Sequence, residues 1–245
     1  MKLDNNIFRA IVIIACIFIV LPVAANTKIL PASFFEFQEF VYLQSGNMTE
    51  TMRFYRIAKQ DIEKTLTGAD FHLALSRCEY IIGLYFRAEG RANEANTFFE
   101  RGIASAEKSI ELHPSSEGYR ILGTNVAFLC EGKLSYGIKN VGKIDDYAKL
   151  ALELDSKNLT ARYLIAAKYV VSPWPFGNVR KGIALLEEIT AENINAMEKE
   201  DLFNLYLMLE AACHKLNRHQ EAESWHLKAA ALYPTNKFIE ILVKL

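Results

Sequence analysis

Apolar residues recur every three or four positions along most of this chain, which is the spacing of a helix with one buried face. The clearest example covers residues 202–234 and predicts two helices joined by a short polar link at residues 217–219. Pro234 would end the second helix, because proline cannot continue one. A single pair of helices cannot bury both of its apolar faces, so the pattern predicts several pairs stacked on a continuous core.

Earlier parts of the chain repeat this pattern less regularly. The spacing predicts helices over residues 51–66, 71–88, 91–112, 116–131, 144–154, 159–171, 179–189, 196–216 and 219–232. Residues 132–141 are expected to interrupt the helices because Gly132 and Gly142 bracket them, and residues 172–178 because they contain Pro173 and Pro175. We therefore expect an all-α, right-handed superhelical solenoid of helix pairs.

These elements divide the chain into four parts. Residues 1–25 are a targeting segment, residues 26–70 contain capping helices, residues 71–234 hold about four helix pairs, and residues 235–245 form a last capping helix. The aromatic-rich residues 29–43 suit a cap over one end of the stack. A docking helix for a partner is the alternative interpretation of that stretch.

The N-terminus has the pattern of a secretory signal. Lys2 and Arg9 precede an apolar run over residues 10–21, and small residues follow as far as Ala25. This order predicts export to the periplasm with cleavage after Ala25. Two alternatives stay open: the segment remains uncut as a membrane anchor, or Cys16 is lipidated and the chain is a lipoprotein.

Composition narrows the class of protein. The chain has 245 residues, of which 51% are hydrophobic, and its net charge is −1, so it offers no basic surface for nucleic acid. Cys78, Cys130 and Cys213 remain after residue 25, with spacings that fit neither a disulfide framework nor a metal site. We expect buried free thiols, and one bridged pair is the alternative.

No stretch carries a recognisable catalytic pattern. His219, Glu223 and His226 lie near one face of a predicted helix, but His226 occupies a core position, so packing is favoured over zinc binding. Asp145 and Asp146 are adjacent on a helix and would point apart, as is typical of acidic residues near a helix start. The sequence therefore predicts a protein that is not an enzyme and has no metal or cofactor.

The concave face, formed by the first helix of each pair, is the expected binding surface. Its predicted residues are Arg120, Thr124, Phe128, Leu164, Lys168, Asn204, Leu207, His214 and Lys215. The cations among them would suit an acidic peptide or a C-terminal carboxylate, and a solvated face without a ligand is the alternative. Trp174 either packs as a plug between helix pairs or is an exposed binding residue, and we expect packing because prolines flank it.

The repeat unit resembles the tetratricopeptide repeat. Four residues fall on the spacing of that family, namely Tyr206, Leu209, Ala222 and Pro234. Three others depart from it: Glu210, Cys213 and His226 stand where glycine, tyrosine and phenylalanine are usual. The resemblance implies stacked helix pairs, and the departures imply irregular stacking.

A narrower resemblance rests on the glycine-broken residues 132–142, on Ser-Pro-Trp-Pro-Phe-Gly at residues 172–177 and on Glu-Gly-Tyr at residues 117–119. With these features the chain is similar to the T component associated with TRAP transporters, and more distantly to the regulator of microtubule dynamics proteins. The T-component resemblance implies a periplasmic helper of a substrate-binding protein and a transporter, with a pore large enough for a ligand.

Two functions follow as expectations. The first is an exported scaffold that binds a protein partner in the cell envelope, such as a substrate-binding protein or a transporter subunit. The second is an accessory of a TRAP-type system that binds a hydrophobic small ligand. A closed apolar cavity near Trp174 with convergent polar groups would favour the ligand, and an open polar groove would favour the protein partner.

Overall fold

The structure is a computed structural model, and it describes residues 30–44 and 46–241. The predictions of a cleaved signal, a membrane anchor and lipidation at Cys16 concern residues outside this range. So do residues 242–245 of the predicted last capping helix. Among the described helices, none combines the length and the apolarity needed to span a bilayer.

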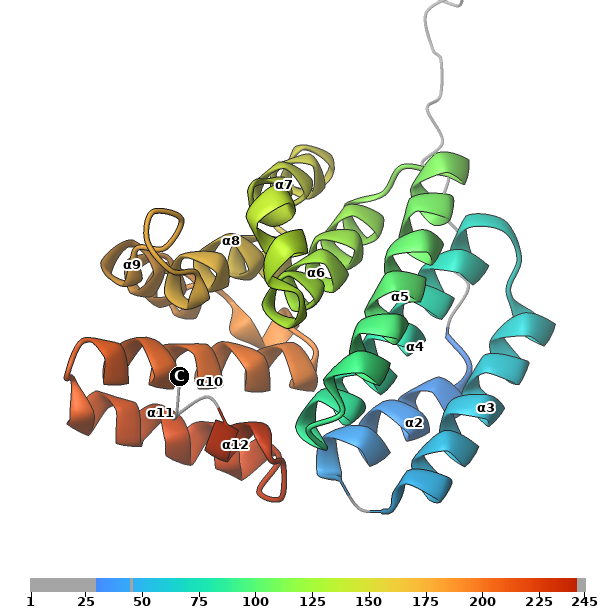
Figure 1. Cartoon of the computed structure of the whole chain (residues 1–245), viewed down its shortest axis with the longest axis horizontal. Helices are drawn as coiled ribbons and strands as arrows, with labels where there is room; N and C mark the ends of the chain where they lie inside the picture. The colour runs from blue at the N-terminus through green and yellow to red at the C-terminus, as the bar shows by residue number, and fades with distance from the viewer. Residues whose placement is uncertain (1–29, 45, 242–245) are drawn as a thin grey trace, which may run out of the picture.

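All regular structure in the described residues is helical. The helices are α2 (Ala32–Leu43), α3 (Met48–Thr65), α4 (Gly68–Ala88), α5 (Ala92–Leu112), α6 (Ser116–Gly132), α7 (Leu134–Leu154), α8 (Leu159–Val171), α9 (Val179–Thr190), a short 3-10 helix (Ile194–Ala196), α10 (Lys199–Lys215), α11 (His219–Leu232) and α12 (Phe238–Ile241). Successive helices pack as pairs, from α2 with α3 to α10 with α11 (Figure 1). The prediction of an all-α, tetratricopeptide-like helix-pair solenoid is confirmed.

Local sequence explains where several helices begin. Asn47, Ser115, Asn158 and Asn178 each precede a helix, and each side chain accepts a hydrogen bond from a backbone N–H of the first turn. At Asn47 the cap is reciprocal, because the Glu50 side chain also accepts from the Asn47 backbone. These caps satisfy donors that have no partner inside the helix.

Small residues allow the helices of a pair to approach closely. A Cβ placed on Gly83 of α4 would lie 2.5 Å from Cε1 of Phe99, a fully buried side chain on α5. The absence of a side chain at Gly83 therefore leaves room for the Phe99 ring. This close packing contributes to the core shared by α4 and α5.

The predicted interruption at residues 132–141 is wrong. Only Lys133 separates α6 from α7, and α7 continues through Gly137 and Gly142 without a break. Gly137 has a packing role instead, because a Cβ there would lie 2.8 Å from the backbone oxygen of Cys130. The glycine lets α7 turn back tightly against the end of α6.

The first and last parts of the solenoid are in contact. Tyr42 of α2 packs against Phe203 of α10 and Tyr233, with ring centroids 6.0 Å and 5.1 Å away. Nδ2 of the buried Asn236 donates a hydrogen bond of 2.8 Å to the backbone oxygen of Tyr42. Lys199 adds an ion pair of 2.7 Å with Glu39. The stack of helix pairs therefore curves back until its two ends meet (Figure 1).

Candidate binding cavity

The curved solenoid holds a partly open cavity of about 620 Å³. Its walls come mainly from α4, α6, α8 and α10, the first helices of four pairs, with further residues from α2, α7 and α12. Most of the lining is apolar or aromatic, as shown by Tyr80, Phe128, Tyr163, Leu164 and Leu207. A cavity of this size and chemistry is within the range of sites that hold small organic molecules.

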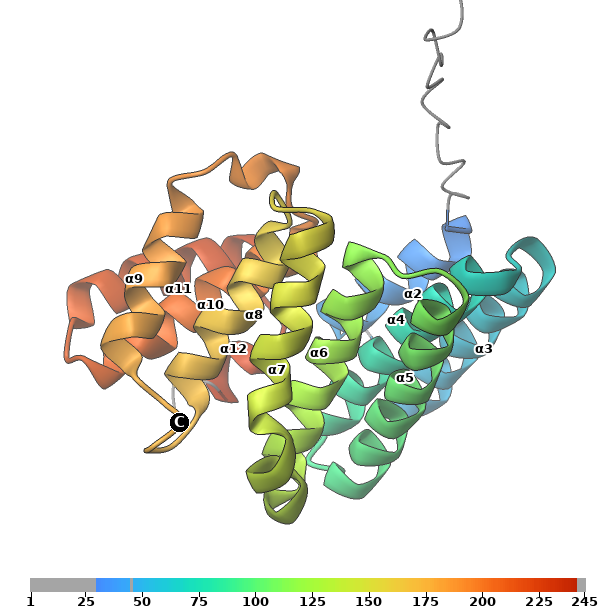
Figure 2. The same ribbon diagram turned by 90° about the horizontal axis from the view of Figure 1, so that it is seen from above.

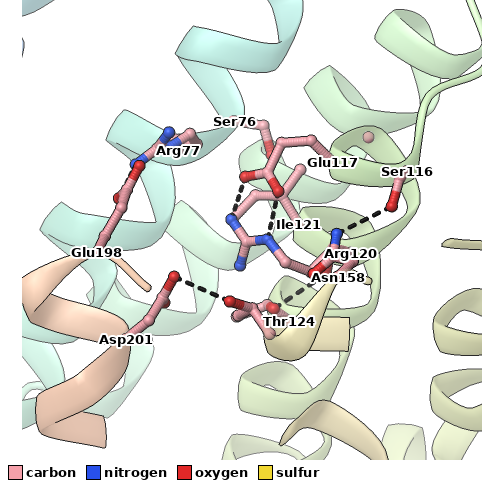
Figure 3. Close-up of polar contacts among 12 residues, drawn as sticks. Ser76, Arg77, Ser116, Glu117, Arg120, Ile121, Thr124, Asn158, Glu198 and Asp201 are labelled. Atoms are coloured by element: carbon pink, nitrogen blue, oxygen red, sulfur yellow. Dashed lines mark hydrogen bonds and ion pairs between the residues drawn. The ribbon is translucent and has the colours of Figure 1, made fainter. Parts of the chain in front are cut away.

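A group of paired charges lies at one end of the cavity (Figure 3). Nε of Arg120 donates a hydrogen bond of 2.7 Å to Glu117, and a second guanidinium nitrogen contacts the other oxygen of that carboxylate. The Asp201 carboxylate accepts a hydrogen bond of 3.1 Å from the Thr160 hydroxyl. Thr160 and Asp201 also line a smaller neighbouring pocket, so these polar groups separate two hollows.

Burial and pairing set the ionisation of this group. Burial is the largest influence on Arg120 and would lower its pKa, but the Glu117 carboxylate raises that pKa above its usual value. Burial also raises the pKa of Asp201, and the charge of Arg120 opposes this shift. Arg120 is therefore a permanent cation, already neutralised by a carboxylate of its own helix.

Two further predicted cations, Lys168 and Lys215, differ in how they are held. Lys168 forms an ion pair with Asp145, and only 8% of its side chain is exposed. Nζ of Lys215 donates a hydrogen bond of 3.2 Å to the backbone oxygen of Val170 near the end of α8. The expectation that the predicted cations offer free positive charge to a carboxylate is wrong for Arg120 and Lys168, because each is paired with a carboxylate. Lys215 is exposed and keeps its charge, because a backbone oxygen does not neutralise it.

Arg87 and Glu131 form a second polar region of the cavity wall. Arg87 donates hydrogen bonds to the Asn96 side chain at 3.0 Å and to the backbone oxygen of Phe128 at 3.2 Å. The Glu131 side chain is exposed and lines the cavity. Desolvation at the cavity wall raises the pKa of Glu131 to about 7, and the charge of Arg87 opposes the shift. Glu131 can therefore donate or accept a hydrogen bond near neutral pH.

Most of the predicted groove residues lie on the cavity wall. The structure places Arg120, Thr124, Phe128, Leu164, Lys168, Asn204, Leu207 and Lys215 there. Trp174 and His214 are not among the lining residues. The packed position expected for Trp174 is wrong, because 89% of this residue is exposed. Its loop is ordered by backbone hydrogen bonds such as that from Asn178 to Tyr169, and the Trp174 ring lies in solvent.

His214 belongs to a separate polar contact on α10 and α11. Its Nε2 lies 3.9 Å from the carboxylate of the buried Glu210, and Nδ1 of His226 lies 3.0 Å from the same oxygen. The core position expected for His226 is wrong, because 36% of its side chain is exposed while its ring contacts Glu210. Across the described part of the chain, no three histidine, cysteine or acidic side chains are placed to hold a metal ion.

Sequence reasoning missed several residues of the cavity wall. Glu131 lies one helical turn beyond the predicted Phe128, so the same register extended to the end of α6 would have found it. Arg87, Tyr80 and Asp201 carried no comparable signal, because their approach to α6 depends on how the helix pairs curve.

Comparisons with known proteins add little to this geometry. No protein-family model and no curated protein matches the sequence. The similar solved structures include three of proteins with tetratricopeptide-type repeats. YrrB, described as a TPR protein with an unusual peptide-binding site, is 14% identical, covers 89% of this chain and all 100% of its own, and has a TM-score of 0.37. TPR-like repeats of a putative kinesin light chain from Podosopora anserina are 17% identical over 81% of this chain, with 94% of their own length covered and a TM-score of 0.40. A variant of the same repeats, with 93% of its own length covered, has a TM-score of 0.41. Scores this low give no basis for transferring a binding site.

Proposed function

We propose that this chain is a non-enzymatic binding protein that encloses the apolar part of a small amphipathic molecule in its cavity. The observation that carries the proposal is the cavity of about 620 Å³ with aromatic and aliphatic walls. Burying such a molecule removes apolar surface of both the ligand and the cavity wall from water. Each Å² of buried apolar surface contributes roughly 25 cal/mol of favourable free energy. The polar regions at Arg120 and at Arg87 would orient the ligand.

Closure of the solenoid favours a small ligand over an extended peptide. A peptide groove needs an open concave surface, whereas contacts from Tyr42 to Phe203, Tyr233 and Asn236 join the two ends of this solenoid. The cations Arg120 and Lys168, which were expected to hold a peptide carboxylate, are paired with Glu117 and Asp145. Among the described lining residues that were expected to bind a carboxylate, only Lys215 is a lysine or arginine without an ion pair, so a neutral or singly charged headgroup suits the cavity better than a multiply charged anion.

The proposed place of action is the cell envelope. The basic start, the apolar run and the small residues over residues 1–25 support export. The resemblance to T components suggests that the chain serves a TRAP-type transport system, passing a ligand to or from a substrate-binding protein.

A scaffold for a protein partner in the envelope is the second candidate. Three leucines favour it, because Leu112, Leu150 and Leu154 are exposed toward the C-terminal ends of α5 and α7. Large apolar side chains left in water are suited to contact with another protein. In this case the partner, and not a small molecule, would be the physiological ligand.

The proposal is tested by measuring probe binding before and after a substitution that fills the cavity. The full chain is titrated with the apolar fluorophore N-phenyl-1-naphthylamine, and organic extracts of the purified protein are examined by mass spectrometry. Ala127 lines the cavity, whereas Ala184 is exposed on α9, so Ala127→Trp should abolish probe binding and the matched control Ala184→Trp should retain it. The proposal fails if Ala127→Trp binds the probe as well as wild type does. It also fails if no small molecule is extracted and Ala127→Trp instead abolishes capture of a transporter subunit, a result that would favour the scaffold.

A further inference from the structure

Large apolar side chains surround the mouth of the cavity. Leu134 is 78% exposed, Ile138 is 63% exposed and Phe176 is 43% exposed, although all three also line the cavity. Trp174, at 89% exposure, lies two residues before Phe176. These four residues, called the rim below, come from the start of α7 and from the loop between α8 and α9. Both segments lie on the same side of the molecule, at the bottom of Figure 2.

The rim is held in place and is not a loose segment. In the α8–α9 loop, the backbone N–H of Phe176 donates to Pro173 at 2.9 Å, and that of Asn178 donates to Tyr169 at 2.8 Å. The Asn178 side chain then caps α9. Leu134 and Ile138 lie four residues apart on α7 and so share one helix face. The apolar side chains are therefore presented to the solvent by ordered backbone.

The two segments that carry the rim are basic, although the exposed Glu131 lies directly before the first of them. Residues 132–144 include three lysines and no acidic residue, and residues 172–182 include Arg180 and Lys181 and no acidic residue. Lys133 is paired with Glu100, and Lys181 donates a hydrogen bond to the Tyr169 hydroxyl. The remaining basic side chains, Lys139, Lys143 and Arg180, are exposed.

No carboxylate of the described residues forms an ion pair with Lys139, Lys143 or Arg180. Their charges are therefore available to a ligand or a surface outside the protein. The whole chain carries a net charge of only −1, so these two segments are more basic than the chain as a whole.

We propose that the rim docks on the surface of an anionic phospholipid bilayer. Tryptophan favours the interfacial zone of a bilayer, where its ring is partly buried among headgroups. Exposed leucine, isoleucine and phenylalanine side chains gain free energy by entering the same zone, and lysine and arginine beside them are attracted to anionic headgroups. The combination of an apolar rim with unpaired cations fits such a surface better than it fits water.

This docking goes beyond the proposed ligand binding, because it does not require that the cavity be filled. It would turn the mouth of the cavity toward the bilayer. A membrane-derived amphipathic molecule would then reach the cavity without crossing bulk water.

The chain has two tryptophans, Trp174 and Trp225, which makes the docking directly measurable. In Trp225→Phe, the fluorescence reports Trp174 alone. Vesicles of phosphatidylglycerol and phosphatidylcholine, with and without bromine on the acyl chains, are added to the full chain. We expect a blue shift and quenching by the brominated lipid. In the matched control Trp174→Phe, the remaining Trp225 on α11 should be unaffected, since it stacks on Tyr206 with ring centroids 5.7 Å apart.

The electrostatic part is tested with Lys139→Gln, Lys143→Gln and Arg180→Gln combined. Each basic residue near an anionic surface strengthens binding by about fivefold, so the triple variant should partition about 100-fold more weakly into the anionic vesicles. Every variant retains residues 1–29, so their contribution to membrane binding is common to all. The proposal is overturned if Trp174 is not quenched, if Trp225 is quenched equally, or if the triple variant binds like wild type.

Discussion

Glu210 and His226 are hydrogen-bonded across the last helix pair, with His226 Nδ1 3.0 Å from Glu210 Oε1. Both residues depart from the tetratricopeptide pattern, in which glycine and phenylalanine are usual at these positions. The Glu210 side chain is almost fully buried, and this burial raises its pKa, while the bond to His226 opposes the rise. The two departures therefore compensate each other.

That pairing predicts a non-additive effect on stability. His226→Phe should lower the free energy of unfolding by about 1–3 kcal/mol, because Glu210 then stays buried without its partner. The double variant Glu210→Ala with His226→Phe should recover much of this loss. Urea denaturation of the two single variants and the double variant measures the coupling free energy. Purely additive losses would contradict a specific interaction between the two side chains.

Closure of the solenoid depends on Asn236. Its side chain is buried and donates to the backbone oxygen of Tyr42 at 2.8 Å. Asn236→Ala leaves that oxygen without its partner and should lower the free energy of unfolding by about 1–3 kcal/mol. It should also increase hydrogen exchange in α2 and α12, because the ends of the solenoid separate more often. Asn193→Ala, at an exposed position, is the control and should change neither measurement. Unchanged exchange in Asn236→Ala would show that closure does not need this bond.

Substituting alanine for two helical glycines, Gly83 and Gly142, should change the stability of the fold in opposite directions. Gly83→Ala places a methyl group 2.5 Å from the Phe99 ring and should destabilise the fold by about 1–3 kcal/mol. Gly142→Ala, on α7, meets nothing within 4 Å and should stabilise the fold by about 0.5–1 kcal/mol, because alanine loses less backbone entropy in a helix. The stabilities of Gly83→Ala, Gly142→Ala and wild type are compared by thermal denaturation monitored by circular dichroism. Equal effects would be inconsistent with the close packing of α4 on α5.

The raised pKa of Glu131 predicts a pH dependence of stability. In the folded chain this carboxyl loses its proton near pH 7, whereas an ordinary glutamate does so near 4.5. Between these values the folded state keeps a proton that the unfolded state has released, so raising the pH favours unfolding. The contribution of Glu131 to stability should therefore decline from pH 4.5 to above pH 7.

Glu131→Gln removes this titration. Its free energy of unfolding should fall less than that of wild type over the same pH range, and urea denaturation at several pH values measures the difference. Glu63→Gln, at an exposed position on α3, should follow the wild-type profile. If Glu131→Gln also follows that profile, Glu131 does not titrate with a raised pKa.

The sequence by itself determined the local structure of this protein. Helical spacing of apolar residues, caps such as Asn158 and stops such as Pro234 act within a few residues of one another, so most helices were predicted to within a few positions. The same register identified the cavity face of α6, α8 and α10. The prediction of a helix interruption at residues 132–141 was wrong. Glycines in a sequence can mark either a helix break or a site of close helix packing, and Gly137 is a packing site.

Only the tertiary structure decided how the helix pairs meet. Tyr42 and Asn204 are 162 residues apart, yet Asn204 donates a hydrogen bond of 3.2 Å to the Tyr42 hydroxyl. Such contacts depend on small rotations summed over every helix pair, and no local pattern encodes that sum. The same curvature enclosed the cavity and paired Lys168 with Asp145. The exposure of Trp174 was likewise not predictable, because Pro173 and Pro175 indicate a rigid loop but not whether that loop lies between helices or in solvent.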